Sequence, residues 1–292
     1  MIGRNDPCWC GSQQKWKKCH YPDPGPQTQE SLRKEYYKKH QILLKTPEQI
    51  DGIRKAGKLA ASILEELCAF AKEGVTTAEI DQLSRKLHAD AGATAAALNY
   101  GSPPFPGSIC TSLNEMICHG IPNNVPLKDG DILNIDCASI LNGYYGDCSK
   151  MVCIGNITQE KQLVVDVAYD SLMKSIEMLK PGVKVSEIGT FIQKYAEGKG
   201  CSVVYQFVGH GVGTRFHENP QVSHVRNSLH VPLAPGMTFT IEPMINAGTS
   251  EGIIDPENDW EARTADGRPS AQWEHTLLIT EEGCEILTPW KR

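Results

Sequence analysis

The feature that most constrains the fold is a pair of apolar segments joined by Asn142-Gly143. Segments 131–141 and 144–154 both read as β-strands. An Asn-Gly pair readily adopts the two left-handed conformations that a two-residue type I′ turn requires. The sequence therefore predicts a β-hairpin in which Leu141 pairs with Tyr144.

This register brings two aspartates together. Asp136 falls opposite Ser149, and Asp147 precedes Ser149 by two residues on the same strand and face. A diagonal pair of this kind is separated by roughly 7–8 Å. Two carboxylates this close, among apolar neighbours, repel each other and lose solvation unless a proton or cation compensates. Their hard oxygens favour a divalent metal, although two solvated aspartates near a turn remain the alternative.

Length and composition indicate a globular protein with a substantial core. The chain has 292 residues, 40% hydrophobic and 22% charged, which allows one large domain or two smaller ones. A net charge of −6 gives no general footprint for nucleic acid. No apolar run approaches the roughly 18 residues that cross a bilayer. The N-terminal residues lack the apolar core of a signal peptide, so we expect a cytoplasmic protein and no membrane partner.

The eleven cysteines agree with a reducing compartment. Eight are scattered singly, which is not the pattern of a disulfide scaffold, and most of these should be small buried hydrophobes. The other three lie near the N-terminus beside a histidine, within 13 residues. These four residues have the number and type of ligands that a closed tetrahedral zinc site uses, and the segment has few apolar residues to fold otherwise. They are Cys8, Cys10, Cys19 and His20. Unpaired surface thiols are the alternative.

This N-terminal segment closely resembles the SEC-C motif, a short zinc-binding module that ends the bacterial translocation ATPase and is also attached to other proteins. The matching residues are Pro7, the C-x-C pair, Gly11-Ser12, Lys15, Lys17-Lys18 and Cys19-His20. The resemblance implies a docking device, because a closed zinc shell has no free position for catalysis. Its lysines, interleaved with Trp9 and Trp16, would contact an acidic protein or ribosomal RNA. A solvated basic face is the alternative.

The rest of the chain begins with a linker. Residues 22–28 are rich in Pro and Gly and cannot sustain a helix or strand. A charged helix from Glu30 to Leu44 is predicted next, with exposed lysines, and Thr46-Pro47 marks the start of another helix. We therefore divide the chain into a zinc-binding module (1–22), a linker with a charged helix (23–45) and a large domain (46–292).

Two helices open the large domain, and their pattern recurs 108 residues later. Apolar and small residues from Ile50 to Ala71 have helical spacing, and a second helix is predicted from Ala78 to about Ala91. Glu73-Gly74-Val75 corresponds to Pro181-Gly182-Val183, and the last two residues of the two triplets are identical. The other pairs with this offset are Glu79-Ile80 with Glu187-Ile188, Ala60 with Ala168, Leu64 with Leu172 and Gly92 with Gly200. We interpret this as an internal duplication, with two related halves around a central cleft and helices covering one face of a curved antiparallel sheet.

Three more polar residues stand in unusual places. His210 lies between glycines, where a ring can project from a bend. Glu242 and Glu274 each lie in an apolar, strand-like run, where an unpaired charge is costly and requires a positive partner. A structural histidine and two edge-strand glutamates are the alternatives, and the pair Asp136 and Asp147 weighs against them.

These segments resemble type I methionine aminopeptidase in order and spacing, over roughly residues 46 to 292. They are C-H-G-I-P at 118–122, N-I-D at 134–136, G-D-C-S-K at 146–150, G-H-G-V-G at 209–213, F-H-E-N-P at 216–220, I-E-P-M at 241–244 and E-H-T at 274–276. The resemblance implies an α+β pita-bread fold with two related halves. It also implies that two divalent metals, cobalt, manganese, iron or zinc, activate a water for attack on the scissile carbonyl. The implied ligands are Asp136, Asp147, His210, Glu242 and Glu274, with Asp147 and Glu274 bridging.

The resemblance further implies roles around the metals. Glu242 would also shuttle the proton, His119 and His217 would contact the substrate, and His217 would stabilise the developing oxyanion. The implied pocket for a methionine side chain consists of Tyr100, Phe105, Cys110, Phe216 and Trp260; without the resemblance these would be core residues. The Tyr100–Cys110 loop is longer than the family pattern. We expect His224, His230 and His275 to be structural.

The sequence thus predicts a cytoplasmic, monomeric, two-metal exopeptidase that removes the initiator methionine from nascent chains with a small second residue. The zinc module would position it on the ribosome or a partner protein. Two alternatives are considered. Pita-bread enzymes that cleave Xaa-Pro peptides or creatine usually carry an extra N-terminal domain and lack the matched pocket. Pita-bread proteins that survive as ribosome-binding or RNA-binding modules lose at least one metal ligand, whereas all five are present here.

Overall fold

The structure, a computed structural model, describes residues 2–22 and 28–292. Their contacts form two units, Met1–Leu43 and Leu44–Arg292. The sequence placed this boundary after residue 45. Contacts place it earlier because Leu44 is buried and the Lys45 N–H donates a hydrogen bond to the Gly236 carbonyl within the second unit. Residues 23–27, the centre of the predicted linker, lie outside the described residues.

Along the described residues, four helices precede five strands, and two more helices precede ten strands. The helices are α1 (Trp16–Cys19), α2 (Gln29–His40), α3 (Pro47–Phe70), α4 (Thr77–Asp90), α5 (Gln159–Glu177) and α6 (Val185–Glu197). The strands are β1 (Thr94–Ala95), β2 (Cys110–Leu113), β3 (Met116–Cys118), β4 (Ile132–Leu141), β5 (Tyr144–Cys153), β6 (Ser202–Val203), β7 (Gly209–Gly211), β8 (Glu218–Val222), β9 (Thr238–Ile241), β10 (Met244–Asn246), β11 (Gly252–Ile254), β12 (Ala262–Thr264), β13 (Ser270–Gln272), β14 (His275–Ile279) and β15 (Cys284–Ile286). Within the described residues, the helices are too short or too polar to cross a bilayer.

Helix α2 ends earlier than the sequence predicted. It was expected to continue to Leu44 but stops at His40, because Gln41 adopts a left-handed conformation (φ 57°) and its N–H donates to the Tyr37 carbonyl. That arrangement is a C-terminal cap, which satisfies a carbonyl that the helix leaves free. The helix begins where Thr28 accepts a hydrogen bond from the Ser31 N–H.

Helix α3 begins at the Thr46 cap that the sequence indicated, and α4 begins at Thr77, one residue before its predicted start. The Thr46 hydroxyl accepts from the Gln49 N–H, and the Gln49 side chain accepts from the Thr46 N–H. Thr76 and Glu79 form the same reciprocal box at the start of α4. Each box satisfies two donors that a helix N-terminus would otherwise leave unpaired.

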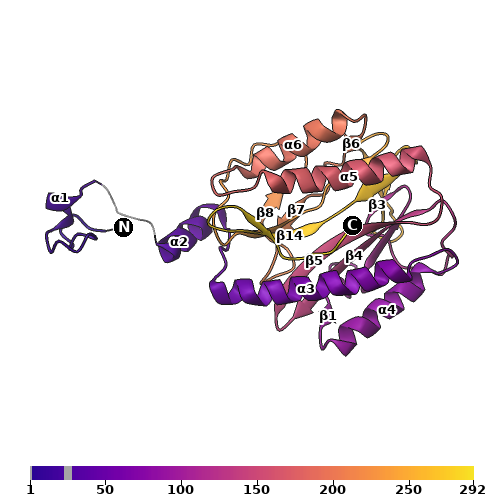
Figure 1. Cartoon of the computed structure of the whole chain (residues 1–292), viewed down its shortest axis with the longest axis horizontal. Coiled ribbons are helices and arrows are strands. Elements are labelled where there is room, and N and C mark those ends of the chain that lie inside the picture. Colours follow the sequence, from indigo (N-terminus) through magenta and orange to yellow (C-terminus); the bar gives the residue numbers. More distant parts are fainter. Residues whose placement is uncertain (1, 23–27) are drawn as a thin grey trace. The chain divides into compact units, whose positions relative to one another are not determined.

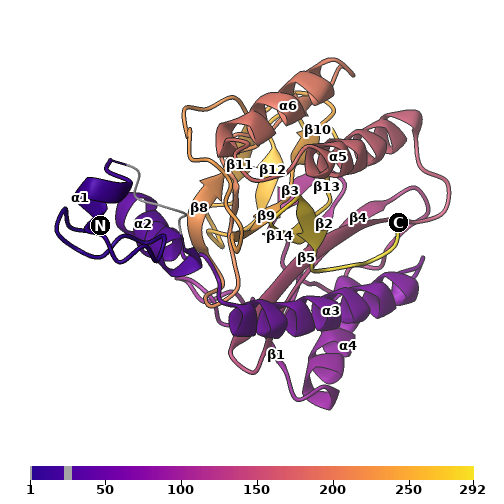
Figure 2. The ribbon, with the colours of Figure 1, turned by 60° about the vertical axis from the view of Figure 1, so that its left-hand side comes forward.

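The internal duplication is confirmed. Helices α5 and α6 repeat α3 and α4, and Gly74 and Gly182 both adopt a positive φ, 85° and 91°. Their N–H groups donate to equivalent carbonyls, those of Leu127 and Leu233. In both Figure 1 and Figure 2 the pair α3 and α4 and the pair α5 and α6 lie on opposite sides, with the strands between them.

The expected antiparallel strands covered by helices are present, and among the described residues hydrogen-bonded pairing groups them into four sheets. The register shifts at His210/Gly211, between β7 and β8, and at Ala262/Arg263, between β12 and β3, are irregularities within two of these sheets. Strands β4 and β5 form the predicted hairpin, with Leu141 opposite Tyr144, and belong to a sheet with β1 and β2. A second sheet has the order β15-β14-β9-β7-β8. An isolated bridge between Ser149 and Glu274 connects these two sheets.

Helix α3 packs against β5 at a contact where two glycines meet. A Cβ added to Gly146 would lie 2.4 Å from the Gly57 Cα, so neither backbone has room for a side chain. The α3 face turned inward is apolar and includes Ile53, Leu64 and Leu67. The close approach lets this face bury itself directly above the strand that carries Asp147.

This contact predicts that Gly146→Ala destabilises the protein. The new methyl group would force α3 away from β5, and overpacking of this kind costs up to about 3 kcal/mol. The free energy of unfolding, measured by urea denaturation, should fall by that amount. Gly143→Ala is the matched control, because its added Cβ meets nothing within 4 Å. Its positive φ alone should cost about 1 kcal/mol. Equal losses for both variants would argue against the packing explanation.

Candidate metal centre

The hairpin and the five-stranded sheet converge on one group of carboxylates. Asp136 lies opposite Ser149, and Asp147 lies opposite Ala138, so the two aspartates share a face of the hairpin. On the other side of β5, the Glu274 N–H donates to the Ser149 carbonyl at 3.2 Å. Ser149 is therefore the backbone junction that places Glu274 next to both aspartates.

The five-stranded sheet adds the remaining two residues. His210 lies in β7, and Glu242 directly follows β9. Because Ile241 pairs with His275, the same register continued by one residue places Glu242 opposite Glu274. The first half thus supplies two aspartates and the second half supplies His210 and two glutamates. All five predicted metal ligands lie together.

Distances confirm that the side chains approach one another. His210 Nε2 lies 3.6 Å from Asp147 Oδ2 and 3.6 Å from Glu242 Oε1. One ligand atom each of Asp147, His210 and Glu274 lies within 4.8 Å of the others, an arrangement that could hold a metal ion.

Without a cation, ionisation of these buried carboxylates is unfavourable, and their pKa values are raised. Burial raises the pKa of Asp136 to about 7, and burial together with the charge of Asp136 raises the pKa of Glu242 to about 8. Burial and neighbouring carboxylates also raise the pKa values of Asp147 and Glu274 well above their ordinary range. A bound dication reverses this penalty, because it stabilises the ionised form of every surrounding carboxylate.

Two buried oxygen atoms fit the requirement for a metal. Among the residues that the structure describes, Asp147 Oδ1 and Glu274 Oε2 have no hydrogen-bond partner, although these two side chains belong to residues only 4% and 1% exposed. Buried polar atoms without partners are rare and call for an explanation. His210 is also suitably arranged: its Nδ1 lies 3.1 Å from the Gly211 carbonyl, which favours a proton on Nδ1 and leaves the Nε2 lone pair facing the carboxylates.

Three neighbours orient Glu242, and the sequence analysis did not identify them for this role. The Thr240 hydroxyl donates to Oε1 at 2.7 Å, and the Gln272 amide donates to Oε2 at 3.1 Å. His224 Nε2 accepts the Glu242 N–H at 3.2 Å. Thr240 and Gln272 precede Glu242 and Glu274 by two residues, so the period of a strand would have placed them on the same face. His224 had no such signal.

A second group of rings lies beside the carboxylates. The His217 ring is 4.1 Å from the His210 ring, centroid to centroid, and its Nδ1 lies 2.7 Å from the Tyr100 hydroxyl. Phe216 packs edge-on against Tyr100 at 4.9 Å. Cys110 pairs with Asp136 across β2 and β4, which places this predicted pocket residue next to the metal ligands.

Trp260 joins the other predicted substrate residues. Its ring lies 5.8 Å from His119 and 5.2 Å from Phe105. The long Tyr100–Cys110 loop supports it, because the Trp260 indole N–H donates to the Pro103 carbonyl at 3.0 Å. Phe105 itself is only 2% exposed and lies behind Trp260.

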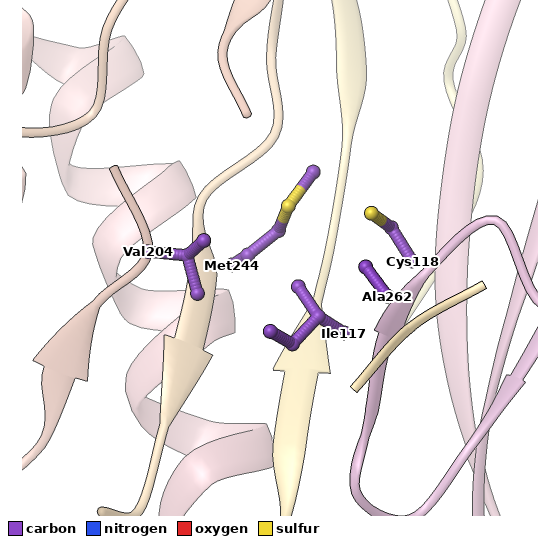
Figure 3. Close-up of a cluster of buried hydrophobic side chains, with 5 residues drawn as sticks. All are labelled: Ile117, Cys118, Val204, Met244 and Ala262. Carbon is purple, nitrogen blue, oxygen red and sulfur yellow. The ribbon is translucent and has the colours of Figure 1, made fainter. Parts of the chain in front are cut away.

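His119 is supported by an apolar cluster at the junction of the two halves. Figure 3 shows Ile117 and Cys118 of β3 close to Ala262, with Met244 and Val204 beside them. Phe207 packs against this cluster and meets the His119 ring edge-on at 5.4 Å. Nothing local to residues 204–207 indicated this contact in the sequence.

A buried ion pair holds the segment that carries His217. The Lys45 ammonium bonds to Glu218, and both side chains are nearly inaccessible to solvent. Glu218 also accepts from the Thr214 N–H and hydroxyl and from the Arg215 N–H. Burial alone would raise the pKa of Glu218, but these partners outweigh it and lower the pKa; burial lowers the pKa of Lys45.

The N-terminal unit contains a separate cluster of four ligands. Cys8 Sγ and Cys19 Sγ lie 3.2 Å and 3.1 Å from His20 Nδ1, and Cys10 Sγ lies 3.5 Å from Cys19 Sγ. All four ligand atoms lie within 4.8 Å of one another, as in the shell predicted for zinc. Hydrogen bonds with Ser12 lower the pKa of Cys10 to about 6, which favours the thiolate that binds metal.

Comparisons with known proteins agree with both centres. Residues 51–281 match metallopeptidase family M24, and residues 4–22 match the SEC-C motif. A protein of Chlamydia pneumoniae named methionine aminopeptidase is 59% identical over 285 residues, which are 98% of this chain and 98% of the relative.

Solved structures share the fold. The crystal structure of methionine aminopeptidase from Rickettsia prowazekii superposes with a TM-score of 0.82 and 43% identity, covering 85% of this chain and all of that one. A prolidase from Pyrococcus horikoshii has a TM-score of 0.70 at 21% identity, covering 90% of this chain and 66% of that one. The second likeness shows the fold alone.

The ion pair predicts a strong dependence of stability on both partners. Lys45→Met or Glu218→Gln alone leaves one buried charge unpaired, and such changes cost about 3–5 kcal/mol. The double variant removes both charges and should recover most of that loss. Urea denaturation of the four proteins gives the coupling free energy. Additive losses in the double variant would contradict the ion-pair interpretation.

Proposed function

The chain belongs to metallopeptidase family M24, and within it to the methionine aminopeptidases, and we propose that it removes the initiator methionine from nascent chains whose second residue is small. It is a hydrolase of the exopeptidase class, and its substrates are peptides with an N-terminal methionine. The observation that carries the proposal is the close grouping of Asp147, His210 and Glu274, with Glu242 beside His210 and Asp136 on the same hairpin face as Asp147. Two buried oxygens, Asp147 Oδ1 and Glu274 Oε2, have no hydrogen-bond partner among the described residues. A pita-bread protein that only binds RNA or ribosomes has no need to retain all five.

Asp136, Asp147, His210, Glu242 and Glu274 would hold two divalent cations. The unpartnered oxygens belong to Asp147 and Glu274, which supports bridging roles for these two carboxylates. When bound, the cations polarise the scissile carbonyl and make water a stronger nucleophile near neutral pH. The mixed carboxylate and imidazole shell suits cobalt, manganese, iron or zinc.

Glu242 is proposed to move the proton. Its two oxygens receive hydrogen bonds from Thr240 and Gln272, so the carboxylate has one fixed orientation. A carboxylate held in one orientation beside the attacking water can accept its proton and return it to the leaving amine. Its neutral hydrogen-bond donors hold it in place and leave its charge available.

His217 and His119 are proposed to act on the substrate carbonyl and amine. If Tyr100 donates its hydroxyl proton to His217 Nδ1, then Nε2 carries a proton and can donate to the developing oxyanion. Burial and the neighbouring His217 lower the pKa of His119 to about 4, so its ring is neutral and can accept or donate one hydrogen bond.

Specificity for methionine is proposed to come from the aromatic residues and Cys110. Tyr100 and Phe216 lie on the His217 side, while Phe105 and Trp260 lie on the His119 side. Aromatic edges and soft sulfur suit a thioether side chain.

The N-terminal unit is proposed to bind structural zinc and to position a monomeric enzyme on the ribosome or a partner protein in the cytoplasm. Its four ligand atoms already lie within bonding range of a single ion. All eleven cysteines are free thiols, which supports a reducing compartment.

The catalytic proposal predicts metal-dependent release of methionine. The metal-free protein should release none from Met-Ala-Ser, and one or more of the four metals should restore release. Asp147→Asn keeps the size of the side chain but removes a bridging charge, so kcat should fall more than about 100-fold, since changes outside the ligand shell already cost 10–100-fold. Met-Leu-Ser, with its larger second residue, should be cleaved far more slowly.

Chromatographic detection of free methionine measures each rate. Circular dichroism shows whether Asp147→Asn retains the fold. If the wild-type protein released no methionine with any of the four metals, the binding-module alternative would be preferred.

The zinc proposal predicts a separate metal count. Replacing Cys8 and Cys19 by serine removes two of four ligands, so elemental analysis should find one zinc fewer per chain. Methionine release should be unchanged, because the five catalytic ligands lie in the other unit. A variant lacking residues 1–22 should co-sediment less with ribosomes. Co-sedimentation equal to that of the full chain would count against the docking role.

A further inference from the structure

The segment 287–291 lies against the residue that the proposed function makes a bridging ligand. Trp290 is 7% exposed, and its indole N–H donates to the Glu274 carbonyl oxygen at 2.9 Å. Its ring stacks on His275, with centroids 3.9 Å apart and planes 18° from parallel. Trp290 therefore contacts both the ligand's backbone and the next side chain.

Further contacts hold this segment in place on both sides of Trp290. The Thr288 hydroxyl accepts from the Thr276 N–H at 3.0 Å and lies 3.2 Å from His275 Nδ1. The Lys291 N–H donates to Glu65 Oε1 at 2.6 Å, and the Lys150 ammonium donates to the Lys291 carbonyl. The segment around Trp290 is thus held by residues of strand β14, helix α3 and strand β5.

The same strand also fixes the other proposed bridging ligand. The Thr276 hydroxyl donates to the Asp147 carbonyl at 2.8 Å, and the Asp147 N–H lies 3.2 Å from the same oxygen. Glu274, His275 and Thr276 therefore connect the backbones of both bridging carboxylates, and the segment containing Trp290 supports all three.

We propose that Trp290 is a positioning residue for the metal centre: its indole N–H fixes the Glu274 backbone so that the carboxylate is aimed before the ions bind. The inference rests on the proposed function. Simple core packing would need only an aromatic ring, and phenylalanine would provide that. The hydrogen bond to the backbone of a ligand whose Oε2 is buried and unpartnered is what distinguishes the positioning role.

Trp290→Phe tests the proposal because it keeps a ring for stacking and removes the N–H. Cobalt(II) is added to metal-free full-length protein that carries Cys8→Ser and Cys19→Ser, so that the N-terminal cluster does not bind it, and binding is followed by the visible absorption of the bound ion. The midpoint should rise about 10-fold, the effect expected of a partner outside the ligand shell. The absorption spectrum should also change, since it reports the ligand geometry. At saturating cobalt, kcat should fall more than KM changes.

Tyr195→Phe is the matched control. It removes a hydroxyl that donates to Asp170 on the α5 and α6 side of the protein and also keeps its ring. Its cobalt midpoint and spectrum should equal those of the wild type. Thr288→Val gives a second measurement on the same segment if Trp290→Phe does not fold, and it should raise the midpoint in the same direction.

The outcomes separate this inference from the function on which it rests. If Trp290→Phe lowers the melting temperature but leaves the cobalt midpoint and spectrum unchanged, Trp290 only packs and the inference is overturned. If the wild-type protein binds no cobalt and releases no methionine, the proposed function fails and this inference fails with it. A shifted midpoint in Trp290→Phe, with an unchanged control, supports it.

Discussion

The structure depends on four buried carboxylates that lie close together and repel one another when they are ionised. Burial raises the pKa values of Asp136, Asp147, Glu242 and Glu274, and neighbouring carboxylates raise those of the last three further. Such an arrangement persists only if the surrounding backbone fixes it. Two antiparallel sheets do so, and the Ser149 to Glu274 bridge connects them at the point where the charges meet.

The groups that surround the carboxylates orient them without neutralising them. Thr240 and Gln272 bind Glu242, and Thr276 binds the backbone of Asp147, each through an uncharged donor. The buried ion pair between Lys45 and Glu218 serves a different purpose, because it holds the segment with His217 and involves none of the four carboxylates. The negative potential is thus preserved for cations.

The sequence predicted features that depend on local patterns, and long-range contacts were largely beyond it. The hairpin register follows from the Asn142-Gly143 turn, and the helix caps follow from neighbouring residues. The ligand set came through a family resemblance. By contrast, the Lys45 and Glu218 pair spans 173 residues, and neither residue carries a local sign of its partner. The bond from Trp290 to Glu274, and the contact of Phe207 with His119, likewise depend on tertiary packing. The early end of α2 depends on one left-handed residue, Gln41, which helix propensity does not reveal.

The duplicated architecture divides the ligands unequally, two from the first half and three from the second. Neither half alone can build the complete coordination shell, and the seam between them must close before all five side chains meet. We therefore expect the affinity for a dication to depend on how completely the protein has folded. A chain in which only one half has folded offers an incomplete shell and should bind ions weakly. Ions bound at the proposed ligands would stabilise the finished protein selectively, since a ligand that binds only the native state shifts the folding equilibrium toward it.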